Sequence, residues 1–170
     1  FLSDIPALAI AGDAVDPEQL EHPSRWSISG IRRFMIGFGL VSTLFDLLTF
    51  ATLRFGFDAS PALFRSGWFV ESTLTELVAM LVLRTWRPAF RSRPGSGLLW
   101  SSVGVALVTA ALPFSPFAGP LALVGLPATL LAALLGLTAV YMAANEIGKR
   151  MLGEDREVRG FPMTERGIEG

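Results

Sequence analysis

The 170-residue sequence contains no cysteine and only one histidine, His22. The missing cysteines exclude disulfides, thiolate metal sites and cysteine nucleophiles, and one histidine cannot assemble a zinc site. Charge is also scarce, because 17% of the residues are charged and the net charge is −1. This balance argues against a nucleic-acid partner. No P-loop, Gly-rich dinucleotide-binding turn or catalytic triad pattern occurs, so we predict neither catalytic nor cofactor-binding residues in the chain.

Hydrophobic residues, in contrast, make up 51% of the sequence, and the mean hydropathy is +0.51. Both values are typical of a small bundle of membrane helices and high for a soluble domain. We therefore predict an all-α, polytopic membrane helical bundle, in which the end of one helix precedes four transmembrane helices. The predicted spans are 1–11 (partial), 31–54, 67–84, 97–113 and 121–147, within a transmembrane domain of residues 1–150.

Two further features bear on the last span and the tail. Pro127 should kink the last span or mark its first turn. Residues 151–170 are charged and Gly-rich, which predicts a disordered cytosolic tail.

Twelve of the fourteen Lys and Arg fall in three segments that would share one side of the membrane. The positive-inside rule then places the C-terminus in the cytosol.

Asp46 is the only charged residue between Phe34 and Leu53. Ser42, Asp46 and Thr49 are spaced so that one polar stripe faces away from lipid. Asp46 could coordinate a cation or handle a proton, or the stripe could supply a structural hydrogen bond between helices, which we slightly favour.

The segment from Gly67 to Leu83 carries two carboxylates, Glu71 and Glu76. They are five residues apart, about 140° around a helix, so they do not form one paired site. Glu71 is expected one turn from the end, near Trp68, at headgroup depth. Glu76 is deeper and is the better ligand candidate, although it could instead be protonated or paired with a neighbouring helix.

Asp4 lies in the apolar opening stretch, which is too short to span by itself and suits the end of a membrane helix. Pro6 should break the helical ladder beside the acid, and freed carbonyls next to a carboxylate can hold a cation in transporters. The alternative is a frayed end, and the stretch alone does not separate the two. Because the chain begins with Phe1 and lacks a signal peptide, we expect it to be the C-terminal piece of a longer protein.

Several motifs together resemble one family. Ser3-Asp4-Ile5-Pro6 and Pro23-Ser24-Arg25-Trp26 resemble the end of the sixth membrane helix of P-type cation ATPases and the loop after it. Residues 31–50 resemble the seventh helix of the magnesium-transporting branch, and residues 63–94, with GWFVES and RT…P…SRP, its eighth helix and following loop. LPFSP at 112–116 resembles the turn between its last two helices.

This resemblance implies an ATP-driven cation pump with ten membrane helices, three cytosolic domains and Mg²⁺ as the transported ion. Asp4 matches the sixth-helix acid that coordinates transported cation, so the candidate metal ligands are Asp4, Glu76 and Asp46. The magnesium importers usually carry glutamine where Glu76 stands and proline where Leu40 stands. An extra acid within the bundle could change the choice of ion or add a counter-ion.

The chain lacks the family's DKTGT phosphorylation motif, so ATP would bind elsewhere in the full-length pump. The implied partners are the lipid bilayer, the rest of the ATPase and the transported cation, in the cell (plasma or inner) membrane. A free-standing membrane scaffold or regulatory protein derived from that domain is the alternative, and a passive channel is a weaker one.

Overall fold

The computed structural model describes residues 2–10, 28–85, 91–92 and 94–158, and the side chains of 2–10, 32–85, 91–92 and 94–151. All regular secondary structure in these ranges is helical, which confirms the all-α prediction. Four helices are long and apolar enough to cross a membrane, as the sequence predicts. These four spans are Arg32–Gly56, Pro61–Leu83, Ser96–Phe114 and Ala128–Met151.

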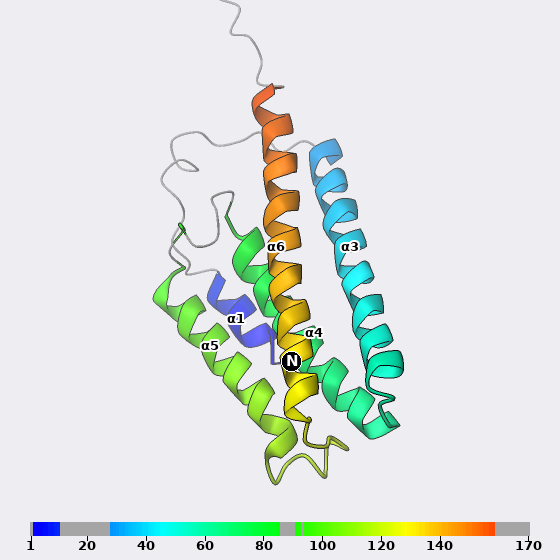
Figure 1. Cartoon of the computed structure of the whole chain (residues 1–170). Coiled ribbons are helices and arrows are strands. Elements are labelled where there is room, and N and C mark those ends of the chain that lie inside the picture. The colour runs from blue at the N-terminus through cyan, green and yellow to red at the C-terminus, as the bar shows by residue number, and fades with distance from the viewer. Residues whose placement is uncertain (1, 11–27, 86–90, 93, 159–170) are drawn as a thin grey trace, which may run out of the picture.

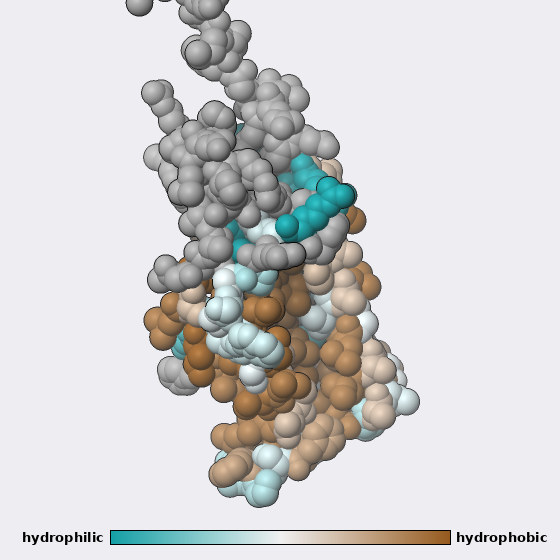
Figure 2. All heavy atoms as spheres, turned by 90° about the vertical axis from the view of Figure 1, so that its left-hand side faces the viewer, coloured by the Kyte–Doolittle hydropathy of each residue, from teal (hydrophilic) through white to brown (hydrophobic). Residues whose placement is uncertain are grey.

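The four long helices run alternately up and down (Figure 1). They are α3 (Ile28–Ala51), α4 (Pro61–Leu83), α5 (Ser96–Ala111) and α6 (Ala128–Val158). Helix α6 packs against α3 and α4, whereas α5 packs against α4 and the short α1. Apolar residues cover much of the helical surface in Figure 2, and strongly hydrophilic residues gather near the end where α6 terminates.

Helix α4 begins six residues before the predicted start at 67. The Ser60 side chain accepts a hydrogen bond from the Leu63 backbone N–H at 3.3 Å, and Pro61 occupies the first turn. Serine as the N-cap and proline just inside the helix are favourable start signals. Because α4 starts earlier than predicted, Glu71 and Glu76 lie further from its N-terminal end.

Helix α6 differs from the predicted span of 121–147 at both ends. Residues 116–127 form turns and irregular backbone, and the helix begins at Ala128, directly after Pro127. The Pro127 carbonyl accepts the N–H of Leu131 at 3.0 Å, so this proline precedes the first turn and does not kink the helix. At the other end α6 continues to Val158. The prediction of a disordered tail from 151 is therefore wrong for 151–158, where no proline interrupts the helix, and 159–170 lie outside the described residues.

The partial helix predicted at 1–11 appears as α1 (Asp4–Ala9), with residues 1 and 11 outside the described part of the chain. Pro6 is buried in its first turn, where a backbone N–H needs no acceptor within the helix. The predicted break beside Asp4 therefore stays a prediction.

The buried apolar core lies where α3, α4 and α6 meet near the turn before α6. Its members are Leu53, Val70, Leu126, Leu130 and Leu134. Leu53 ends the long α3 segment within a π-helical turn, η2 (Thr52–Gly56). A 3-10 turn, η3 (Leu112–Phe114), ends α5.

Candidate functional site

The three predicted ligands Asp4, Asp46 and Glu76 lie on three different helices, and all three side chains are exposed. Within the described residues, no group of three or more His, Asp or Glu side chains is close enough to hold a metal ion. The structure therefore does not bring the three predicted ligands together within the described residues. His22 lies outside these residues.

The predicted polar stripe on α3 makes one contact between helices. The Ser42 and Tyr141 hydroxyls are 2.8 Å apart, which joins α3 to α6, and the Tyr141 ring meets Phe45 edge-on. Thr49 is fully buried, whereas Asp46 is exposed. The stripe thus supplies the structural hydrogen bond that we favoured, through Ser42.

Glu71, which we expected at headgroup depth, is instead buried near the middle of α4. It lies ten residues after Pro61 and twelve before Leu83, and only 1% of its surface is exposed. The early start of α4 explains the difference. Neither carboxylate oxygen of Glu71 has a hydrogen-bond partner among the described residues.

Two groups on α3 act on this carboxylate. The Thr49 side chain is close enough to interact with it, and Asp46 acts on it electrostatically. The buried Thr49 hydroxyl also makes no hydrogen bond of normal geometry within the described structure. An unsatisfied carboxylate and an unsatisfied hydroxyl therefore face each other across the contact between α3 and α4.

Sequence reasoning ranked Glu76 above Glu71, and the missed signal was Gly67. This glycine lies one turn before Glu71, so both residues occupy the same face of α4. A Cβ added at Gly67 would be 2.6 Å from the Leu53 side chain. A glycine that admits a neighbouring helix so closely marks the inward face, and Glu71 shares that face.

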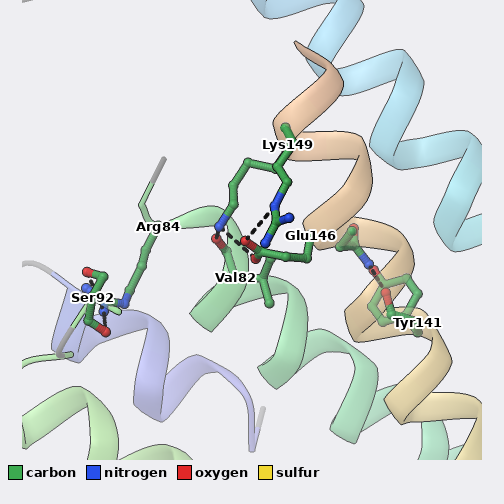
Figure 3. A network of polar contacts seen from close by, with 8 residues as sticks. Val82, Arg84, Ser92, Tyr141, Glu146 and Lys149 are labelled. Atoms are coloured by element: carbon green, nitrogen blue, oxygen red, sulfur yellow. Dashed lines mark hydrogen bonds and ion pairs between the residues drawn. The ribbon is translucent and has the colours of Figure 1, made fainter. Parts of the chain in front are cut away.

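A second polar group lies at the end of the bundle where α4 terminates (Figure 3). Lys149 on α6 is 2% exposed, and its ammonium donates to the Val82 carbonyl at 3.0 Å. The same ammonium is 3.0 Å from the Glu146 carboxylate. Arg84, just beyond α4, donates to the carbonyl and the hydroxyl of Ser92 at 2.9 and 3.1 Å. These contacts join the end of α4 to α6 and to the following loop.

The other end of α4 is held by Ser66 and Arg65. The buried Ser66 hydroxyl accepts the N–H of Val124 at 2.7 Å and donates to the Ala62 carbonyl at 3.1 Å. Arg65 donates to the Ala122 carbonyl at 3.1 Å. Helix α4 is therefore anchored at both ends, with Glu71 between the anchors.

Known proteins match this chain over almost its whole length. A family described as "Cation transporting ATPase, C-terminus" matches residues 1–151. The chain is 39% identical over 154 residues to the protein named "Magnesium-transporting ATPase, P-type 1" of Escherichia coli strain K12, covering 88% of this chain and 17% of that protein. A protein of the same name from Salmonella typhimurium strain LT2 is 37% identical over 154 residues, with the same two coverages. A further Salmonella protein of that name is 34% identical over 132 residues, covering 75% of this chain and 14% of that protein. The chain thus spans less than a fifth of the length of these relatives.

Proposed function

Because the chain belongs to the cation-transporting ATPases, as their C-terminal region, we propose that it is a membrane part of an ATP-driven cation pump. The four spanning helices agree with a multi-pass membrane protein. Mg²⁺ is the transported ion in this proposal, because the relatives are named magnesium-transporting ATPases. The phosphorylation and nucleotide-binding steps belong to the rest of the pump.

The exposed acids on the helices support a role within a larger membrane assembly. Asp46 and Glu76 are exposed within segments that span the membrane. A carboxylate at the centre of a lipid-facing helix costs about 2.5–3.5 kcal/mol on insertion scales, so such groups face protein or water. We propose that the preceding helices of the pump cover these positions.

The ion site, in this proposal, is shared between this chain and those helices. Mg²⁺ prefers oxygen ligands in octahedral geometry, and Asp4, Asp46 and Glu76 each offer a carboxylate. Asp4 is the principal ligand, because it matches the sixth-helix acid in the resemblance described above. The remaining oxygens come from helices outside this chain and from water.

The pump lies in the cell membrane with its C-terminus in the cytosol. Arg84 and Lys149 lie together at the end of the bundle from which α6 extends (Figure 3), whereas Arg54 and Arg65 belong to the loop between α3 and α4 and the start of α4. Basic residues thus gather at the end of the bundle that holds Arg84 and Lys149, which supports a cytosolic location of that end under the positive-inside rule.

The substitution Asp4→Asn in the intact pump tests the proposal. It keeps the size of the side chain and removes the charge that would bind the cation. We expect loss of Mg²⁺ uptake and of ion-dependent phosphorylation by ATP. Asp58→Asn is the control, because Asp58 is an exposed acid outside the spans that pairs with Arg54 at 2.6 Å; it should retain both activities. If Asp4→Asn transports normally, Asp4 is not a ligand and the chain has a supporting role only.

A further inference from the structure

Glu71 has three features that the proposed cation site does not explain. Its carboxyl group is buried, it makes no hydrogen bond within the described residues, and it faces the equally unsatisfied hydroxyl of Thr49. An ionised carboxylate buried without a partner costs so much free energy that such groups neutralise instead. Glu71 can be neutralised by a basic side chain, by a metal ion or by a proton.

No basic side chain of the described structure is placed to neutralise Glu71. On η2, Arg54 pairs with Asp58, and on α4 itself Arg65 donates to the Ala122 carbonyl. Helix α5 carries no titratable residue. Neither the loop end of the bundle nor α5 therefore supplies a basic side chain to neutralise Glu71.

The remaining packed helices offer no cation either. On α6, Lys149 contacts Val82 and Glu146, and Val82 is eleven residues from Glu71, about 16 Å along the helix. Tyr141 contacts Ser42 and carries no charge as a phenol. The other α6 groups with described side chains, Glu146 and Arg150, lie at the same end as Lys149 and pair with one another at 3.9 Å. On α3, Arg32 and Arg33 precede Thr49 by at least sixteen residues, about 24 Å along the helix, and Asp46 is a second acid.

A metal ion does not fit the site. Mg²⁺ requires about six oxygen ligands, whereas among the described side chains only the Thr49 hydroxyl and Asp46 act on the Glu71 carboxyl. Among residues with described side chains, no third acid or histidine completes a metal-binding group. A proton, in contrast, needs no cavity and only one oxygen.

We propose that Glu71 is a proton-binding site, in which the packing of α3 and α4 holds the carboxyl group protonated beside the Thr49 hydroxyl. A hydronium ion of the surrounding solution donates the proton as the bundle assembles, so that its O–H bond breaks, a water molecule is released and an O–H bond forms on one carboxyl oxygen. A protonated carboxyl both donates and accepts, and a hydroxyl does the same, so the two groups complement each other. The proton is held by Glu71 and Thr49, neither of which is among the three proposed cation ligands.

Infrared difference spectroscopy of the intact protein in lipid vesicles tests this proposal at neutral pH. We expect the spectrum of the unsubstituted protein minus that of Glu71→Gln to contain the carbonyl stretching band of a protonated carboxylic acid. The control, Asp58→Asn, should instead remove carboxylate bands, because Asp58 is exposed and paired with Arg54. Carboxylate bands in the Glu71→Gln difference would overturn the proposal.

A second variant keeps the test independent of how Glu71→Gln folds. Thr49→Val removes the hydroxyl and leaves a side chain of the same shape. The carboxylic acid band should then remain and shift toward the frequency of a carboxyl group without a hydrogen bond. An unchanged band would show that Thr49 is not the partner. Loss of uptake in Asp4→Asn has no bearing on this band, so the two proposals can fail separately.

Discussion

Replacing Lys149 by methionine should destabilise the protein strongly, because this buried ammonium joins α6 to the end of α4. Its Nζ donates to the Val82 carbonyl and contacts Glu146, each at 3.0 Å, and only 2% of the side chain is exposed. A cation also suits the C-terminal end of α4, where the backbone carbonyls lack partners within the helix. Methionine keeps the length of the side chain and removes both interactions.

The burial of the ion pair sets the size of the expected effect. Removing one partner of a buried ion pair costs about 3–5 kcal/mol, since the other charge stays buried. Glu146 is 13% exposed and keeps a distant contact with Arg150 at 3.9 Å, which places the cost near the lower end of that range. We therefore expect Lys149→Met to reduce the free energy of unfolding by about 3 kcal/mol.

Equilibrium unfolding in mixed detergent micelles measures this cost, and a double-mutant cycle assigns it. Adding Glu146→Gln to Lys149→Met should recover between about 0.5 and 3 kcal/mol, because the carboxylate that remains is then replaced by a neutral amide. Arg150→Met is the control, since Arg150 is 60% exposed and its longer contact should be worth less than about 1 kcal/mol. A cost below about 1 kcal/mol for Lys149→Met, or no coupling to Glu146, would refute the reasoning, since broken buried pairs cost far more.

The same unfolding assay tests two contacts nearer the start of α4. Gly67→Ala places a methyl group 2.6 Å from the buried Leu53 side chain, so we expect a loss of about 1–3 kcal/mol, whereas Gly37→Ala, with no atom within 4 Å, should be neutral or stabilising; equal effects would contradict the close packing. Ser66→Ala removes the acceptor of the Val124 N–H and should cost about 1–3 kcal/mol, while a loss within experimental error would mean that water or another group satisfies this N–H.

The number of spanning helices followed from the sequence, whereas the start of α4 and both ends of α6 did not. Long apolar runs predict a membrane helix wherever they occur, because backbone polar groups in lipid must bond within the helix. The start of α4 was missed because the prediction followed the run without basic residues after Arg65, although Ser60 and Pro61 carry a start signal. In α6 the apolar run from Leu121 reads as helix, but Pro127 lies inside it and the helix begins only afterwards.

The orientation of each helix about its own axis was the part that the sequence could not supply. Five-residue spacing places Glu71 and Glu76 on different faces of α4, but it does not say which face meets another helix. That choice depends on α3 and α6, which pack against the face that carries Glu71 and leave Glu76 exposed. The same limit applies to Lys149. A lysine at the end of an apolar run is expected to be exposed to solvent, whereas Lys149 is buried.

The two anchors of α4 explain how Glu71 is held against Thr49 without a hydrogen bond of normal geometry. Ser66 binds the backbone of Val124 before α6, and Lys149 on α6 binds the backbone of Val82. Sliding α4 along α6 by one turn, about 5.4 Å, would break both contacts together. The anchors therefore fix the register of α4 on α6, so the helix cannot shift to bring Glu71 toward water. With that movement blocked and no basic partner among the described residues, binding a proton is the response left to the carboxyl group.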